Sequence, residues 1–464
     1  MTRSYSLAVA VLAMVLAGSM ATAANVTWDG SGDMTWSEPD PTSWSGATYQ
    51  SGDTAEFHGA GLGGVAISGT VTPGAVVVNS AGDYVFSGGA IGGSTGLTKA
   101  GAGMLTLSGA SSFTGSVVVN EGVVKIGNMY AFGARNAAFG KVIVASGAAV
   151  ELNGVVDAGY GYTIAGSGVG GTGAIVNTGG GISNGNLQTS NIRLADDATI
   201  GGTGNWALLA PGYGATMLDL AGHTLTKAGT NTFTIANATL TSGAIRIAGG
   251  TFTQYRRAHD AGAVAFTLDN TAGANLHLGD YDLTVGSLAG GGGSGGYVNL
   301  NGHTLTVGNA DSTTFAGRIT GSSGRLTKTG AGTLTLSASN DFTGSVTVNQ
   351  GTLRIGNSRA LGAADTSVAK VIVNPGGTLD LNGVVDAVYG YTIAGAGVGG
   401  AGALVNNGPG IGNNYMQSSN ITLAADATIG GTGNFALLAS GYGATTLDLA
   451  GHTLTKAGTN TFTI

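Results

Sequence analysis

Cysteine, proline and charged residues are scarce in this chain. It contains no cysteine and 6 prolines, and only 9% of its 464 residues are charged, against roughly 25% in typical globular proteins. Without cysteine, no disulfide can stabilise the fold, and so few charges do not cover an ordinary solvated globule. The low proline content and the lack of a strict Gly-X-Y period exclude a proline-rich linker and a collagen helix. Stability must therefore come from backbone pairing and apolar packing.

Glycine, threonine and valine make up much of what is present, with 88 glycines alone. Branched side chains suit a pleated strand, and glycine supplies the positive φ angles that tight turns need. Apolar residues alternate with Thr, Ser or Asn until Gly or Asn-x-Gly intervenes. In "GSVVVNEGVVKIGN" (Gly115 to Asn128), Val117 and Val119 share one face, and Val124 and Ile126 follow a turn. This pattern predicts short, half-buried strands.

The N-terminus reads as a secretory signal, residues 1–24. A basic Arg3 precedes the apolar stretch "LAVAVLAMVL" (Leu7 to Leu16), and "ATA" (Ala21 to Ala23) supplies a small-residue cleavage site. No later apolar run approaches the roughly 20 residues of a membrane-spanning helix. We therefore expect export to the cell surface, the outer membrane or the medium, without a transmembrane helix.

The charge balance argues against a nucleic-acid partner. Of the 17 basic residues, removal of Arg3 with the signal leaves 16 against 24 acidic ones, a net charge of about −8. Such a surface repels phosphates.

One long unit is duplicated. Residues 97–235 align without a gap to residues 326–464, with 97 identities in 139 positions. A solenoid can be lengthened by duplicating coils, whereas a closed barrel or sandwich cannot easily accept so many paired residues. Stacked coils also explain the scarcity of charge, because like charges about 4.8 Å apart would repel. At roughly 20 to 25 residues per coil, we expect on the order of 20 coils.

Two phrases carry a resemblance to a known family. "GLTKAGAGMLTLSGASSFTGSVVVNEGVVKIGN" (Gly96 to Asn128) and "GRLTKTGAGTLTLSASNDFTGSVTVNQGTLRIGN" (Gly324 to Asn357) closely resemble the autotransporter-associated β-strand repeat, also called the passenger-associated transport repeat. The resemblance implies a right-handed parallel β-helix exported to the bacterial surface, often as the passenger of a type V secretion protein. The C-terminal translocator barrel or anchor of that family does not appear in this sequence.

The motifs of the sequence predict no catalytic residue, metal ligand or cofactor. His223, His303 and His452 recur in one Gly-His-Thr turn, where we expect the imidazole to cap the turn, and no HExxH motif or close histidine pair accompanies them. "GSGVGG" (Gly166 to Gly171) and "GAGVGG" (Gly395 to Gly400) match GxGxxG. Each leads into a strand-like segment, so the helix that would hold a pyrophosphate is missing.

The most polar cluster lies in residues 251–262, "TFTQYRRAHDAG". We expect an exposed loop that interrupts the regular coils, because an unpaired charge cluster cannot lie inside a coil. A contact with a carbohydrate or a protein partner is the functional interpretation, and an Arg base with an acid, as in a polysaccharide lyase, is the catalytic one. The side chains concerned are Tyr255, Arg256, Arg257, His259 and Asp260.

Three of the four tryptophans gather near the mature N-terminus in "WDGSGDMTWSEPDPTSWSG". The first coil of a solenoid must be covered, so Trp28, Trp36 and Trp44 predict an aromatic N-terminal cap. A sugar-binding platform is the alternative, since indole rings stack on pyranose faces.

The functional prediction is an exported, structural or adhesin-like β-helix passenger without catalysis, whose partners are surface glycans or proteins of a host or neighbouring cell. The alternatives are a polysaccharide-degrading β-helix enzyme and a transmembrane β-barrel, which the 6% aromatic content disfavours. The predicted regions are the signal (1–24), the cap and first coils (25–95), repeat unit 1 (96–324) and a truncated repeat unit 2 (325–464). Ile464 corresponds to Ile235 of the first copy, and the first copy continues beyond Ile235 with further strand-like residues. We therefore expect the natural protein to continue beyond Ile464 too.

Overall fold

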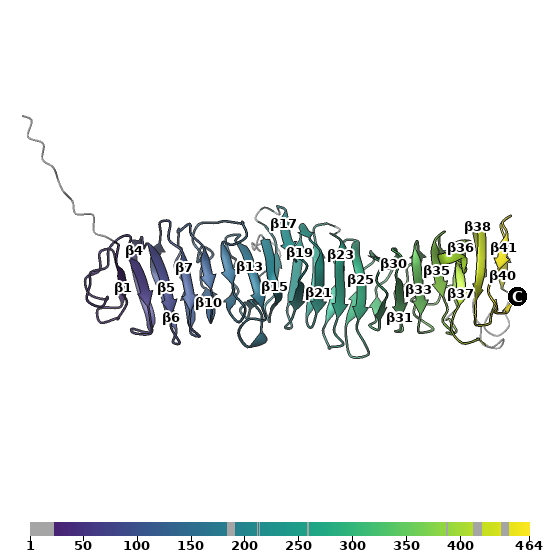
Figure 1. Ribbon diagram of the computed structural model, residues 1–464, viewed down its shortest axis with the longest axis horizontal. Helices are drawn as coiled ribbons and strands as arrows, with labels where there is room; N and C mark the ends of the chain where they lie inside the picture. Colours follow the sequence, from purple (N-terminus) through teal and green to yellow (C-terminus); the bar gives the residue numbers. More distant parts are fainter. Residues whose placement is uncertain are drawn as a thin grey trace, which may run out of the picture.

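The computed structural model is a parallel β-solenoid of about 17 turns, drawn out into a rod (Figure 1). It describes residues 23–182, 191–210, 212, 214–257, 259–386, 388–411, 420–437 and 445–464, so nearly all of the predicted signal lies outside the described residues. The coils follow one another along the rod from the purple N-terminal end to the yellow C-terminal end. The predicted all-β, parallel β-helical fold is confirmed.

The coils differ in length. Leu97 pairs with Val117, an offset of 20 residues, whereas Tyr162 pairs with Ile192, an offset of 30. The observed number of about 17 turns agrees with the expected order of 20 coils, and long corners lengthen several of them. One such corner is residues 129–140, which form turns and bends.

The strands stack in three faces that run along the rod. Most strands pair in parallel with the strand one coil before and the strand one coil after, and strands at the end of a sheet have one such neighbour. Four long strands, β15, β23, β25 and β38, bend at a corner and belong to both the first and the second face.
The first face contains β1 (Asn25–Thr27), β3 (Thr54–Phe57), β5 (Ala75–Asn79), β7 (Leu97–Ala100), β9 (Val117–Val119), β11 (Val142–Val144), β13 (Gly161–Gly166), β15 (Asn191–Gly202), β17 (Thr216–Asp219), β20 (Ala238–Leu240), β23 (His259–Leu268), β25 (Leu283–Gly290), β27 (Thr304–Val307), β30 (Arg325–Lys328), β32 (Val346–Val348), β34 (Val371–Val373), β36 (Gly390–Gly395), β38 (Asn420–Gly431) and β40 (Thr446–Asp448).
The second face adds β2 (Thr35–Trp36), β4 (Gly63–Val71), β6 (Tyr84–Ile91), β8 (Met104–Leu107), β10 (Val123–Ile126), β12 (Ala149–Glu151), β14 (Ile175–Asn177), β18 (Thr224–Lys227), β21 (Gly243–Ile247), β28 (Thr313–Phe315), β31 (Thr333–Leu336), β33 (Gly351–Ile355), β35 (Gly377–Asp380), β37 (Leu404–Asn406) and β41 (Leu454–Lys456).
The third face contains β16 (Trp206–Leu208), β19 (Thr232–Ala236), β22 (Thr251–Tyr255), β24 (Asn275–His277), β26 (Tyr297–Asn299), β29 (Ile319–Thr320), β39 (Phe435–Ala436) and β42 (Phe462–Thr463).

Alternation along each strand sends one set of side chains into the rod. In β8, Leu105 and Leu107 are buried and Thr106 faces outward. Parallel pairing then stacks inward residues of successive coils directly over one another, which forms a continuous apolar column. In the first copy this column is Leu105, Val124, Val150, Ile175 and Ile200; in the second it is Leu334, Leu353, Leu379, Leu404 and Ile429.

The predicted equivalence of inward positions holds in the interior of the rod. Leu105 and Leu334 are both buried, and so are the pairs Val119 with Val348 and Ile126 with Ile355. Leu218 is also buried, but its counterpart Leu447 is only partly covered. Leu447 lies on β40, which among the described residues pairs with β38 alone.

Buried lysines explain the recurring phrase "LTK[A/T]G". Lys227 and Lys328 are the last residues of β18 and β30, and Lys99 is the last but one of β7. All three side chains lie inside the rod. The Lys328 ammonium donates to the carbonyls of Thr329 and Gly330 in its own turn and to that of Gln350 in the next coil. Burial lowers the pKa of Lys328 to about 8, so the ammonium remains the main form at neutral pH. Lys99 and Lys227 make the same kind of contact, so each of the three lysines joins two coils through backbone carbonyl groups.

We expect Lys328→Met to destabilise the protein by about 2 kcal/mol, because it leaves three carbonyls without this donor. Lys456→Met is the matched control: Lys456 occupies the same phrase on β41, is exposed, and donates within its own turn. Its effect should stay within about 0.5 kcal/mol. Thermal unfolding of both variants measures the difference, and equal melting temperatures would contradict the bridging role.

Candidate functional site

The polar cluster of residues 251–262 lies at the corner where the third face meets the first. Strand β22 ends at Tyr255, Arg256 and Arg257 form the corner, and β23 begins at His259. Arg256 has a positive φ of 76°, and its guanidinium lies over the Tyr255 ring at 5.0 Å from the centroid. Arg256, Arg257 and Asp260 are exposed and Tyr255 is half-buried. Of the five residues expected on an exposed loop, three are therefore exposed and one is partly exposed.

His259 is the exception, because its side chain is only 2% exposed. Its Nε2 accepts a hydrogen bond from the backbone N–H of Ala238 at 3.1 Å, and its Nδ1 lies 2.9 Å from Gln254 Oε1. A backbone N–H can only donate, so Nε2 must be unprotonated and Nδ1 must carry the hydrogen. The expectation that His259 lies on an exposed loop is wrong, because a neutral imidazole satisfies buried polar groups on two strands.

Gln254 completes this network and was missed from the sequence. Its side-chain amide donates to the carbonyls of Tyr281 and Asp282 in the next coil, while its oxygen accepts from the His259 backbone. Arg257 Nη2 donates to the Ala238 carbonyl at 2.7 Å. The inner part of the cluster therefore joins three coils, and Arg256 and Asp260 form its outer part. A polar residue at an alternating inward position of β22 was the signal that could have revealed Gln254.

Acid should destabilise the protein through His259. Burial, with a smaller contribution from the Arg257 charge, lowers the pKa of His259 to about 4 from an ordinary 6.5. The unfolded chain therefore binds this proton first, so stability is complete above about pH 6.5 and falls by up to about 3 kcal/mol towards pH 4. We expect His259→Gln to remove the part of the acid destabilisation that comes from His259. Melting temperatures of the natural protein and the variant between pH 7.5 and pH 4 measure this difference. Parallel pH profiles of the two proteins would contradict it.

The three tryptophans form the predicted aromatic cluster at the N-terminal end. Trp28 and Trp44 pack edge to face with centroids 5.2 Å apart, and Trp36 contacts Trp44 and Phe57 at 5.6 and 5.5 Å. All three side chains are buried. Their rings contact one another and the first coils, so in this structure they are not open to stack on a sugar, and the cap is the interpretation that the packing favours.

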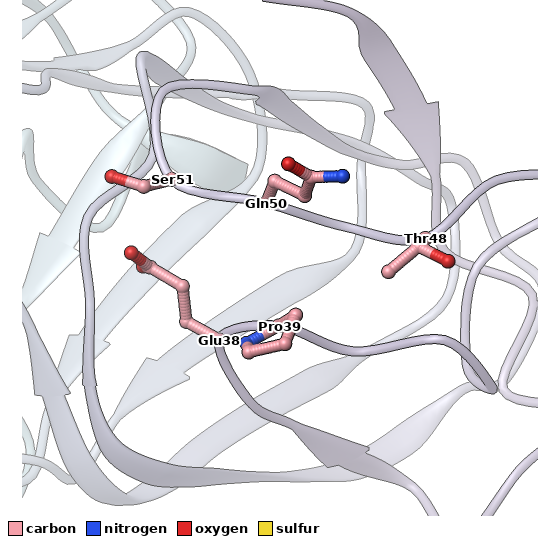
Figure 2. Close-up of a pocket in the computed structure, with 5 residues that line it drawn as sticks. All are labelled: Glu38, Pro39, Thr48, Gln50 and Ser51. Carbon is pink, nitrogen blue, oxygen red and sulfur yellow. The ribbon is translucent and has the colours of Figure 1, made fainter. Parts of the chain in front are cut away.

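A hollow of about 570 Å³ lies on the outside of this cap. Figure 2 shows Glu38 and Pro39 on one segment and Thr48, Gln50 and Ser51 on another, arranged around it. The Glu38 carboxylate accepts hydrogen bonds from the Thr72 N–H and hydroxyl. The hollow offers amide and hydroxyl groups for a polar ligand. These residues follow no spacing pattern, so the sequence could not single them out.

The two GxGxxG segments form short 3-10 turns, η1 (Val169–Gly171) and η3 (Val398–Gly400). Each is followed by a strand, β14 or β37, as the sequence predicted. At the three Gly-His-Thr turns, the capping group is an aspartate of the preceding coil and not the imidazole. The Thr224, Thr304 and Thr453 N–H groups donate to Asp197, Asp282 and Asp426, respectively. The prediction that histidine caps these turns is therefore wrong.

Among the described residues, no helix is both long enough and apolar enough to cross a membrane.

A known repeat family matches three segments of the chain. The family model of the passenger-associated transport repeat matches residues 97–126, 225–253 and 326–355. The first and third confirm the resemblance seen in the sequence. The second, which runs from β18 into β22, was missed, although Leu225 to Gly229 repeats the phrase of Leu97 to Gly101.

A similar curated protein is "Adhesin BmaC autotransporter" of Brucella suis biovar 1 (strain 1330), which is 32% identical over 223 residues. That match covers 44% of this chain and 6% of the relative, so the chain spans a small part of the relative's length. No solved structure matches.

Proposed function

Because the chain carries three passenger-associated transport repeats on one parallel β-solenoid, we propose that it is an exported, adhesin-like passenger displayed on or released from a bacterial surface. The repeat matches carry this proposal, and the similarity to an adhesin autotransporter supports it. Residues 1–24 act as the signal peptide in this proposal. The role is binding and not catalysis: the rod presents its outer residues to glycans or proteins of another cell.

The outer part of the 251–262 cluster is the contact we assign to that role. Arginine and tyrosine are among the residue types that contribute most to binding energy at protein interfaces. The Arg256 guanidinium already lies over the Tyr255 ring in the unbound chain, so the contact is preorganised. Asp260 adds an exposed carboxylate two residues into β23. The scarcity of charge elsewhere on the chain makes this corner chemically distinctive.

Surface display is tested in the source cells with the intact gene. Protease treatment of whole cells should remove the protein, and its mature N-terminus should read from Ala24 or Asn25. Retention of Met1 in a protease-protected protein would overturn export.

Adhesion is tested with beads that carry the mature chain, applied to host cells and to a glycan array. We expect saturable attachment that Arg256→Ala with Asp260→Ala weakens roughly tenfold. Arg325→Ala, which removes another exposed arginine on β30, is the matched control and should not change attachment. Equal attachment of all three proteins would overturn the contact. Release of new sugar ends from acidic or neutral polysaccharides by the purified chain, abolished by heating, would instead support the enzyme.

A further inference from the structure

We propose that Asp196, Asp197 and His223 bind a divalent transition-metal ion of the Zn²⁺ class on the outside of the rod, between two successive coils. One ligand atom from each residue lies within 4.8 Å of the others. His223 Nδ1 is 3.8 Å from Asp196 Oδ1 and 3.9 Å from Asp197 Oδ1. These separations are too long for hydrogen bonds. Two donors that share a Zn²⁺ at 2.0 to 2.2 Å stand roughly 3.4 Å apart, so small rotations of exposed side chains close the site.

A bulge in β15 brings the two carboxylates to one side. Ile164 pairs with Leu194 and Gly166 pairs with Ala198, so β15 has three residues where β13 has one. In a regular strand, consecutive side chains point to opposite faces. Here Asp196 and Asp197 are both exposed. Bulges of this kind re-aim side chains next to functional sites.

The turn before β18 places the histidine opposite them. Asp197 Oδ1 accepts the N–H of Thr224 at 2.7 Å, and Thr224 directly follows His223. This hydrogen bond holds one ligand against the turn that carries another, which preorganises the site. The carboxylates are 77% and 71% exposed, so water can complete the coordination. One imidazole with two carboxylates suits Zn²⁺ and related ions, since all-oxygen sites are typical of Ca²⁺ and Mg²⁺.

The other two Gly-His-Thr turns of the chain can be compared with this site. In the second copy, His452 Nδ1 lies 4.0 Å from Asp426 Oδ1, but Ala425 stands where the first copy has Asp196. His303 likewise faces the one carboxylate of Asp282 at 3.7 Å. Within the described part of the chain, only the first-copy turn assembles three such ligands. Asp282 and Asp426 cap the other two Gly-His-Thr turns as Asp197 caps the first. The feature that distinguishes the first turn is therefore the second carboxylate, Asp196, which supplies the third ligand.

The experiment titrates the metal-free mature chain with Co²⁺ by visible absorption and with Zn²⁺ by calorimetry. We expect one saturable equivalent, at least tenfold weaker in Asp196→Ala and in His223→Gln. Ala425→Asp should raise the stoichiometry from one to two, because it rebuilds the same trio in the second copy. Asp196 is exposed and His223 and Ala425 are partly exposed, and circular dichroism of each variant checks that the rod is intact. Binding that is absent from the natural chain, or unchanged in Asp196→Ala, would overturn the site. The adhesin proposal does not depend on either result.

Discussion

Leu334→Asp should destabilise the coils around β31 by at least about 4 kcal/mol, and Leu105→Asp should do the same in the first copy. Leu334 is 1% exposed and stacks on Leu353 of the next coil. The substitution removes a buried apolar side chain and leaves a carboxyl group among aliphatic ones, where no cation lies in the column. Thermal unfolding followed by circular dichroism measures the loss, which is the largest that we expect for any single change in this chain.

Thr335→Asp is the control for this substitution. It introduces the same charge one position along the same strand, where the side chain faces outward and pairs in register with Arg354. We expect a change within about 0.5 kcal/mol. If both leucine variants had the melting temperature of the natural protein, the wrong face of these strands would have been assigned to the interior.

Trp36→Ala should destabilise the N-terminal coils by about 3 to 5 kcal/mol. The Trp36 ring contacts Trp44, Tyr49, Phe57 and Phe86 with centroids 5.5 to 5.9 Å away, so its removal leaves a cavity in the middle of the cap. In a solenoid each coil contacts only its neighbours, so the damage should remain local. Hydrogen exchange should accelerate in residues 25–71 and stay slow in β31 and β33.

Tyr130→Ala is the matched aromatic control, because Tyr130 is 43% exposed at a corner of the rod. It should leave exchange in the cap unchanged. If Trp36→Ala instead accelerated exchange equally along the whole rod, the coils would form one cooperative unit and the cap would not be an independent end structure.

Alternation and repetition in the sequence were enough to predict the solenoid. Leu105 and Leu107 flank an outward Thr106, and the same phrase returns 229 residues later, so the inward residues of both copies could be named before any coil was seen. The aromatic cap could be predicted for the same reason: an end coil needs a cover, and Trp28, Trp36 and Trp44 were the only large cluster near that end. The region boundaries at 95/96 and 324/325 stay predictions.

The neighbours of each polar residue could not be predicted in this way. Offsets between coils range from 19 residues at Leu334 to 32 at Gly166, so spacing along the chain does not say which residues meet across coils. His259 is a buried structural residue because it accepts a hydrogen bond from Ala238 one coil away. Asp196 lies near His223 because of a bulge in β15, and the alternation of the sequence does not reveal that bulge. The short-range pattern along the chain sets which way a side chain points, and the lengths of the corners set what it touches, because they fix the register in which the backbone of one coil pairs with the next.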